Sequence, residues 1–336
     1  MRGLVQKLLQ LALVLATCVS GAAAIAETRG AIIFSSARQD GSFNQLAHVG
    51  TQRAVDQFNL AVEEWILADE DDLSEVLRAF AKVDVNHILL IGYDHSAAVR
   101  EVAPVYPDVK FTVIDGVVSD LPNVRSIVFS EQEGGFIAGY VAGLKSATRH
   151  VATIGGMDIP PVRRFMCGFV AGAKHADPGI EVDTAFVGLY ITAFRDISGA
   201  QALAEQHYME GADVIFAPAG FAAEGVAKAA GKTDGFVIMV DANQNGLVPG
   251  SVLTSALKRV DEAAFSAWKS AVDGSWTPGM STMSVRENGV DWAVDDHNRA
   301  LVADFEGEVE KVKEDLATGR VRIEPAPELQ ECAAVL

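Results

Sequence analysis

The sequence predicts an α/β protein built from two doubly wound, parallel-sheet lobes. Short runs rich in branched apolar residues recur along the chain, as in "AIIFSS", "HILLIGY" and "GFVIMVD", and a stretch with helical spacing follows most of them. The runs are apolar throughout, which is typical of strands that helices cover on both faces. About 310 residues follow residue 26, enough for two domains of about 150 residues each.

The strands are expected in two sets. Residues 31–36, 61–67, 87–93, 110–115 and 124–130 predict the first sheet, and residues 150–157, 182–188, 213–220 and 235–241 predict the second. Helices are expected between them at 43–59, 73–84, 134–149, 161–176, 198–211 and 225–233. Another strand and helix follow in "SVLTSALKRVDEAAFSAWKSAV", and "STMSVRENGVDWAV" is typical of a β-hairpin with Asn288 and Gly289 at its turn.

No low-complexity linker separates the two sets, so several short crossings are expected to join the lobes. We expect an N-terminal lobe from residues 27–145 plus about 250–278. Residues 146–249 plus about 279–336 then form the C-terminal lobe. Two such lobes can close on a small molecule by a hinge motion, with ligands bound at the carboxyl ends of the strands.

The N-terminus predicts export. Arg2 and Lys7 precede an apolar run too short to span a bilayer, and Ala24-Ile25-Ala26 fits a signal-peptidase site, so residues 1–26 are predicted to be a signal peptide. The alternative is a lipoprotein cleavage at "LATC" with a lipid anchor on Cys18, although Thr17 is unusual before such a cysteine. A soluble periplasmic or extracytoplasmic protein is favoured over the anchored form.

Composition excludes one class of partner. The chain carries 45 acidic and 27 basic residues, for a net charge of −18. Such a surface repels the phosphates of nucleic acid, so nucleic-acid binding is not expected. Cys167 and Cys332 are far apart in sequence and are expected to remain unpaired or buried thiols, with a disulfide as the alternative in an oxidising compartment.

Several motifs together resemble the basic membrane protein (Bmp) family of nucleoside-binding solute receptors of ABC importers. They are "DGSFNQLAHVG", "YPDVKFTVIDG", "NVRSIVFSEQEGGFIAGYVAG", "VATIGGMDIPPVRRFMCGFVAGAKHADPGI", "GADVIFAPAGFAAEG", "VDANQ" and "SVLTSALKRVD", in the expected order from about residue 30 to 305. The resemblance implies a type I periplasmic binding protein fold, a purine nucleoside as ligand, membrane permease subunits as partners and a monomer without a cofactor.

The first candidate site residues lie in the loop at residues 40–50. Phe43 can stack on a flat base, and Asn44 next to it offers both a donor and an acceptor to a base edge. The resemblance implies that this loop holds the nucleoside. Asp40 either accepts a proton from the base or caps the following helix.

Further candidates lie where strands end. Tyr93 and Asp94 follow one strand and either bind ligand or cap a helix, and Phe194 follows a strand of the second lobe, where it can face Phe43 across a cleft. Asp241 and Lys258 each end a strand, and a carboxylate beside an ammonium fits a vicinal diol. The resemblance assigns this pair to the sugar; the alternative is a salt bridge that steadies the hinge.

Gly220 is counted with the ligand-binding residues because it lies in "APAGFAAEGV". Relatives usually carry a glycine-rich loop there, so Phe221 and Glu224 add bulk or charge near the cleft, and Gln39 replaces a second acid. These departures bear on the choice of ligand and leave the architecture unchanged.

No catalytic chemistry is expected. The seven histidines show no metal-ligand spacing and no nucleophile elbow is present, so neither a metal nor an enzyme is predicted. Three alternatives to a nucleoside receptor of an importer remain. They are a sensor subunit, a receptor for a free base or sugar, and a hydrolase on the same scaffold with Asp40 or Asp241 as its acid–base group.

Overall fold

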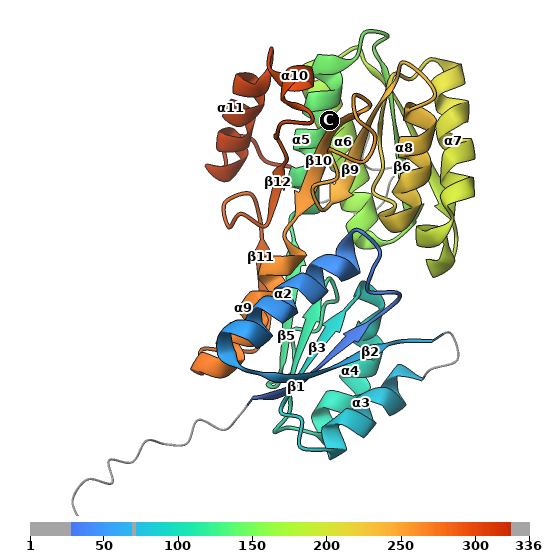
Figure 1. Ribbon diagram of the computed structural model, residues 1–336. Coiled ribbons are helices and arrows are strands. Elements are labelled where there is room, and N and C mark those ends of the chain that lie inside the picture. The colour runs from blue at the N-terminus through green and yellow to red at the C-terminus, as the bar shows by residue number, and fades with distance from the viewer. Residues whose placement is uncertain (1–27, 69–71, 324–336) are drawn as a thin grey trace, which may run out of the picture.

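The structure is a computed structural model that describes residues 28–68 and 72–323. Two α/β lobes are stacked end to end (Figure 1). The predicted signal peptide, its cleavage site at Ala26 and the alternative anchor at Cys18 lie outside the described residues. Within these two segments, no helix combines the length and apolar character needed to cross a membrane.

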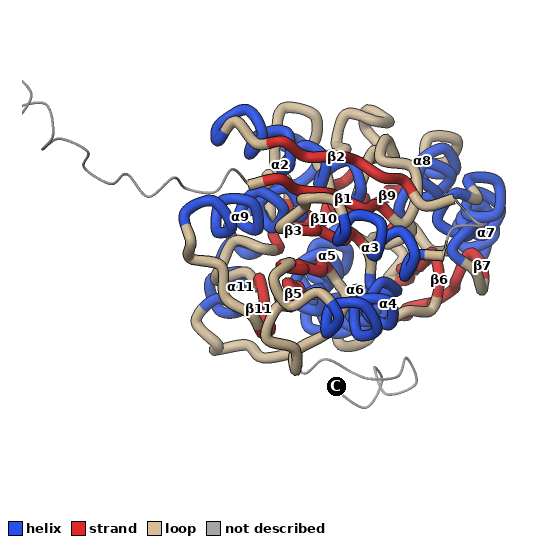
Figure 2. Tube along the Cα trace, turned by 90° about the horizontal axis from the view of Figure 1, so that it is seen from below, coloured by secondary structure: helices blue, strands red, loops and turns tan. Residues whose placement is uncertain are grey.

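The first lobe contains a six-stranded, all-parallel sheet. Across the sheet its strands are β11 (Gly279–Met283), β5 (Val124–Phe129), β4 (Lys110–Ile114), β3 (His87–Ile91), β1 (Arg29–Phe34) and β2 (Ala61–Ile66). Its helices are α2 (Phe43–Phe58), α3 (Leu73–Lys82), α4 (Ser96–Val102) and α9 (Val260–Asp273). Figure 2 shows α2 and α9 on one face of the sheet and α3 and α4 on the other.

The two faces of this sheet explain why its central strands β1 and β3 are largely apolar. Successive strand side chains point to opposite faces. Ile32 and Phe34 of β1 therefore join the apolar cluster under α2 and α9, whereas Ala31 and Ile33 join the cluster under α3 and α4. Covering both faces leaves no alternating polar positions in β1, as the sequence pattern predicts, whereas the edge strand β2 carries Glu63 and Glu64.

The second lobe contains a six-stranded sheet in which only β12 is antiparallel to its neighbour. Across the sheet its strands are β12 (Val290–Trp292), β10 (Val252–Lys258), β9 (Phe236–Asp241), β8 (Val214–Phe216), β6 (His150–Met157) and β7 (Glu181–Gly188). The helices of this lobe are α5 (Glu131–Lys145), α6 (Pro160–Ala176), α7 (Ile197–Glu210), α8 (Ala223–Ala230), α10 (Arg299–Val302) and α11 (Glu306–Ala317).

Glycine lets α5 and α6 approach closely. A Cβ atom added to Gly135 of α5 would lie 2.1 Å from the carbonyl oxygen of Phe165, and one added to Gly172 of α6 would lie 2.0 Å from that of Phe136. No side chain fits at these distances, so glycine is required for the helices to pack backbone against backbone. This contact accounts for the glycines in "GGFIAGYVAG" and "CGFVAGA".

Within the described residues, the chain crosses between the lobes three times. The crossings lie at Ser130, between β5 and α5, at Arg259, between β10 and α9, and at residues 284–289, between β11 and β12. Hydrogen bonds join them: the Ser130 amide donates to the Met283 carbonyl (3.1 Å), and the Arg259 amide donates to the Gly289 carbonyl (2.8 Å). These segments form the predicted multi-crossing hinge.

The crossings fall at different places than the sequence interpretation had them. It ended the first N-terminal segment at residue 145, but α5 packs on α6 of the second lobe. It placed residues 250–278 in the N-terminal lobe and 279–336 in the C-terminal lobe, but β10 pairs with β9, and β11 pairs with β5. At each crossing, a strand and the element that follows it lie in different lobes. The alternation of strands and helices in the sequence does not reveal where this happens.

Two further expectations are wrong, one about the segment 281–294 and one about Cys167. The segment 281–294 is not a β-hairpin, because β11 and β12 belong to different sheets. Cys167 is buried on α6 and is disulfide-bonded, so it is not an unpaired thiol. Cys332 lies outside the described residues.

Candidate functional site

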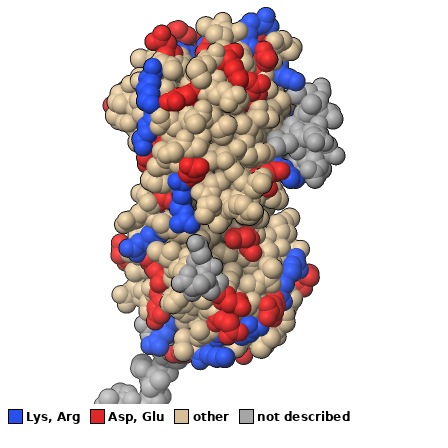
Figure 3. Space-filling view, turned by 90° about the vertical axis from the view of Figure 1, so that its right-hand side faces the viewer, with Lys and Arg blue, Asp and Glu red and all other residues tan. Residues whose placement is uncertain are grey.

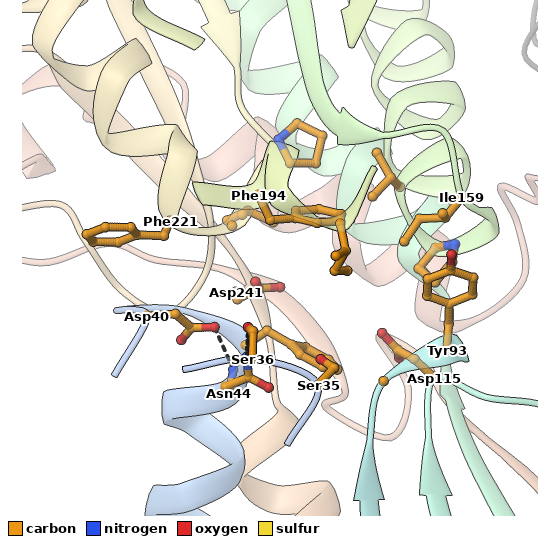
Figure 4. Close-up of a pocket in the computed structure, with 18 of the residues that line it drawn as sticks. Ser35, Ser36, Asp40, Asn44, Tyr93, Asp115, Ile159, Phe194, Phe221 and Asp241 are labelled. Carbon is orange, nitrogen blue, oxygen red and sulfur yellow. Dashed lines mark hydrogen bonds between the residues drawn. The ribbon is translucent and has the colours of Figure 1, made fainter. Parts of the chain in front are cut away.

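A cleft of about 220 Å³ lies between the lobes, at the carboxyl ends of strands from both sheets. Loops after β1, β3 and β4 line it from the first lobe, and segments after β6, β7, β8 and β9 line it from the second (Figure 4). Figure 3 shows the molecule narrowing between the lobes, with acidic side chains on both. The nine residues predicted to bind ligand all line this cleft: Asp40, Phe43, Asn44, Tyr93, Asp94, Phe194, Gly220, Asp241 and Lys258.

Asp40 caps helix α2. Its carboxylate accepts hydrogen bonds from the backbone amides of Ser42 (2.9 Å), Asn44 (3.0 Å) and Gln45 (3.0 Å). Partial burial raises the pKa of Asp40, and these amide bonds oppose the rise. The capping role is therefore present in the structure, and a contact from Asp40 to a base stays a prediction.

Asn44 is buried at the floor of the cleft, 3% exposed. Its Nδ2 donates to Ser36 Oγ at 2.9 Å, whereas its Oδ1 has no hydrogen-bond partner among the described residues. Leaving a buried acceptor unpaired costs roughly 1–3 kcal/mol. A donor on a ligand would remove that cost.

The ring of Phe43 has a partner within the protein. It packs partly on the apolar core, and Lys258 Nζ lies 5.1 Å from the ring centroid. The same ammonium lies 4.9 Å from the ring of Phe129 and 5.9 Å from that of Phe165. Phe43 therefore contributes to a cation–π environment at the hinge as well as lining the cleft.

Four charged side chains, three of them buried and one partly exposed (Arg164), form a group that we call the hinge ion cluster. Lys258 Nζ donates to Asp115 Oδ2 (2.6 Å) and Glu131 Oε1 (2.9 Å), and Arg164 Nε donates to Glu131 Oε2 (2.7 Å). Lys258, Asp115 and Glu131 are nearly inaccessible to solvent. Because Asp115 directly follows β4 of the first sheet and Lys258 ends β10 of the second, the cluster joins the two lobes.

The charges of the cluster stabilise one another. Burial acts to lower the pKa of Lys258, but Asp115 and Glu131 outweigh it, and the pKa is raised. Burial likewise acts to raise the pKa of Glu131, but Lys258 and Arg164 hold it below its usual value. For Asp115 burial dominates and its pKa is raised, although Lys258 opposes the shift.

Asp241 faces the cleft from the end of β9 and is 7% exposed. Ser42 Oγ of the first lobe donates to its Oδ2 at 2.5 Å, a second contact between the lobes. Burial raises the pKa of Asp241 to about 6, against the opposing effects of Lys258 and the Ser42 hydroxyl. No direct Asp241–Lys258 bond occurs among residues 28–68 and 72–323, so the expected salt bridge of this pair is replaced by the hinge ion cluster.

Asp115 and Asp241 share an unusual backbone. Their φ angles are 70° and 65°, in the left-handed region that residues with a side chain rarely adopt. Asp241 ends β9, Asp115 directly follows β4, and both line the cleft. The sequence interpretation missed Asp115 and Glu131, although Asp115 ends "KFTVID" in the same way that Asp241 ends "GFVIMVD".

Aromatic residues form the opposite wall. Phe194 lies in a short 3₁₀ turn (Ile191–Arg195) after β7, across the cleft from Asn44 in Figure 4. Tyr93 extends from the first lobe to the apolar group of Ile159 and Val162 in the second. Asp94 is exposed at the rim.

The altered second-lobe loop contributes one bulky group. Phe221 lines the cleft beside Gly220, whose φ is 57°. Glu224 is not among the lining residues, and its Oε2 lies 3.6 Å from Lys228 Nζ on the same helix, α8. The expected charge near the cleft is therefore absent at Glu224, whereas the bulk of Phe221 is present.

Gly156→Ala is expected to displace Phe194 and to destabilise the protein by about 1–3 kcal/mol. A Cβ atom on Gly156 would lie 2.4 Å from the Phe194 ring. Gly307→Ala is the control, because Gly307 of α11 has open space around its Cβ position and should gain up to about 1 kcal/mol of helix stability. Urea unfolding midpoints measure both changes, and equal midpoints for Gly156→Ala and wild type would contradict the contact.

The fold is shared with solved structures. A crystal structure of ABC transporter system solute-binding proteins from Aeropyrum pernix is 24% identical with a TM-score of 0.82, over 92% of this chain and 98% of that one. An ABC transporter solute-binding protein from Conexibacter woesei is 22% identical with a TM-score of 0.68, over 89% and 99%. Both support the type I binding-protein fold.

Sequence relatives are more specific. An uncharacterized lipoprotein of Pyrococcus horikoshii is 32% identical over 84% of this chain and 73% of its own length. Basic membrane protein A1 of Borrelia garinii is 32% identical over 68% of each chain, and a CD4+ T-cell-stimulating antigen of Listeria monocytogenes is 30% identical over 86% and 85%. The family described as ABC transporter substrate-binding protein PnrA-like (Bmp) matches residues 27–321.

Membership in this family implies a small-molecule ligand, permease partners and an extracytoplasmic location, and it identifies a binding protein instead of an enzyme. With nearly the whole described chain covered by the match, this protein belongs to the Bmp family of ABC transporter substrate-binding proteins.

Proposed function

We propose that the protein binds a purine nucleoside between its lobes and presents the closed form to the permease of an importer. The observation that carries the proposal is the joint lining of one cleft by Phe43 and Phe194, from opposite lobes, with Asp241 and Lys258. Aromatic faces suit a flat base, and a buried carboxylate suits the hydroxyl groups of a sugar.

The charge of the cleft favours a nucleoside over a nucleotide. The carboxylates of Asp40, Asp94, Asp115 and Asp241 line it. Of the two cations among the described residues that line it, Lys258 is already paired within the hinge ion cluster, and Arg195 is exposed. A phosphate would meet several carboxylates at close range, with Arg195 as the one described lining cation outside the hinge ion cluster. Neutral ligands rich in hydroxyl and amino donors are therefore expected.

Closure follows from contacts to both lobes. The Ser42–Asp241 and Lys258–Asp115 hydrogen bonds already cross between them. A ligand that contacts both lobes adds interactions that the open form lacks, so it shifts the population toward the closed form. The closed form is the state that a permease would recognise.

Calorimetric titration of refolded protein with adenosine, guanosine, inosine, free purine and adenosine monophosphate tests the proposal. We expect a nucleoside to bind, the monophosphate to bind far more weakly, and Phe194→Ala or Phe43→Ala to weaken nucleoside binding by about 1–3 kcal/mol, the scale of lost base stacking. Tyr190→Ala is the control, because Tyr190 is 75% exposed four residues before Phe194 and does not line the cleft. No heat with any nucleoside would refute the ligand assignment.

We also infer that cleavage near Ala26 releases the mature protein from the membrane without a lipid anchor, because Ala24-Ile25-Ala26 fits a signal-peptidase site and Thr17 is unusual before a lipoprotein cysteine. The names of the Pyrococcus relatives favour the alternative, a lipid anchor on Cys18. The intact mass of the exported protein distinguishes a chain that begins at Glu27 from an acylated chain that begins at Cys18.

A further inference from the structure

A second group of ligating side chains lies in the second lobe, away from the cleft. His150 begins β6, Glu181 and Asp183 lie on β7, and His207 and Glu210 lie on the last turn of α7. The sequence shows no metal-ligand spacing here because the histidines are 57 positions apart on elements that only the fold brings together. α7 packs against both β6 and β7 (Figure 1).

Strand register and helix geometry place these groups side by side. His150 is directly paired with Glu181, and Asp183, two residues further along β7, lies on the same face as Glu181. His207 and Glu210 are three residues apart on α7 and therefore share one helix face. Asp183 is the group that both halves contact.

The distances suit a small divalent ion. His150 Nε2 lies 2.8 Å from Asp183 Oδ2, His207 Nδ1 lies 3.4 Å from the same oxygen, and His207 Nδ1 lies 3.8 Å from Glu210 Oε2. Ligand atoms that surround a tetrahedral zinc ion at 2.0–2.1 Å lie about 3.3 Å from one another. The ligand atoms of Asp183, His207 and Glu210 all lie within 4.8 Å of one another.

His207 supplies an independent observation. The residue is 8% exposed, and its Nδ1 has no hydrogen-bond partner among the described residues although Asp183 lies close by. No Lys or Arg in the described part of the chain forms an ion pair with Glu181, Asp183 or Glu210. The ion-pair partners of Asp183 and Glu210 are histidines, and the neutral amide of Gln206 also donates to Glu210 Oε1 (2.9 Å). An unpaired buried imidazole nitrogen among uncompensated carboxylates is an arrangement that a bound cation would satisfy.

We propose that Asp183, His207 and Glu210 form a site for a divalent transition metal of the zinc class, with His150 as a further ligand or as the group that orients Asp183. Imidazole nitrogen selects zinc-class ions over Mg²⁺ and Ca²⁺, which take oxygen ligands. The ion would fasten α7 to β6 and β7. The site is formed at the amino ends of strands whose carboxyl ends reach the cleft, so its role is structural and separate from ligand binding.

A zinc titration of tag-free, chelator-treated protein, monitored by calorimetry, tests the site. Thermal unfolding with and without Zn²⁺ is the second measurement. We expect about one equivalent to bind and to raise the unfolding temperature. His207→Gln and Asp183→Asn should each weaken zinc binding at least tenfold. Substitution of a residue that only orients a metal ligand already weakens metal binding by about 10–100-fold, so loss of a ligand should cost at least as much. Mg²⁺ at the same concentration should have no effect.

His48→Gln is the matched control, because His48 Nδ1 also lies 2.8 Å from a carboxylate, Glu64 Oε1, but in the first lobe. Circular dichroism checks that each variant is folded. Zinc binding that His48→Gln retains and the second-lobe variants lose supports the site. The absence of zinc binding in wild type, or unchanged binding in folded His207→Gln and Asp183→Asn, would overturn it, whatever ligand the cleft takes.

Discussion

Lys258→Met is expected to lower the free energy of unfolding by about 3–5 kcal/mol, the usual cost of breaking a buried ion pair by removing one partner. The substitution keeps the length of the side chain but leaves Asp115 without a cation, while Glu131 retains Arg164. Because burial raises the pKa of Asp115, that carboxyl can take up a proton. The loss should therefore be smaller at pH 5 than at pH 8.

Urea unfolding at both pH values measures the effect. Lys269→Met is the control: Lys269 forms an exposed pair with Asp273 at 2.7 Å on α9, and losing an exposed pair costs less than about 1 kcal/mol. Lys258→Met combined with Asp115→Asn should recover part of the loss, because it removes the uncompensated charge. If the single and double variants were equally unstable, the stability of the hinge would not depend on this pair.

The sequence was sufficient to predict the architecture and the location of the cleft. Apolar runs that alternate with helices predict both sheets, and strand ends such as Asp241 and Lys258 meet in one cleft because parallel strands share a direction. What the pattern cannot show is where the chain changes lobes. β10 and α9 are adjacent in sequence and lie in different lobes, since the pattern that marks a buried strand is the same in either sheet.

The ion-pair partners of Lys258 also could not be predicted from the sequence. Asp241 is the nearest strand-end acid in the chain, yet the ammonium pairs with Asp115 and Glu131, 143 and 127 residues away. Both acids reach Lys258 only because three crossings bring the hinge segments together. The histidine–carboxylate group on β6, β7 and α7 was also beyond the sequence, because only the fold of the second lobe brings these three elements together.

Asp241→Asn is expected to make the unliganded protein more stable at pH 7.5 by about 3 kcal/mol. The pKa of Asp241 is about 6 in the folded protein and near 3.8 in the unfolded chain. Between these values the folded state holds more protons, so the stability contributed by this group is present below pH 3.8 and is lost as the pH rises through 6. Asparagine has no charge to bury, and it can still accept the Ser42 hydrogen bond.

The measurement is the difference in unfolding free energy between wild type and Asp241→Asn from pH 4 to pH 8, which cancels the titration of groups that do not interact with Asp241. It should grow with pH and level off above about pH 7. Asp94→Asn, an exposed carboxylate on the cleft rim, is the control and should change stability by less than about 0.5 kcal/mol at any pH. A constant difference across this range would contradict the raised pKa of Asp241.

Asp241→Asn also tests whether the carboxylate of Asp241 serves the stability of the fold or the binding of ligand. If Asp241 accepts hydroxyl protons from a sugar, asparagine should weaken nucleoside binding by about 1.5–3 kcal/mol, the value of a hydrogen bond to a charged group. Stability and affinity would then change in opposite directions. A gain in both would mean that ligand does not use the carboxylate, whereas a gain in stability with a loss of affinity would show that the cleft retains a costly buried charge because the ligand pairs with it.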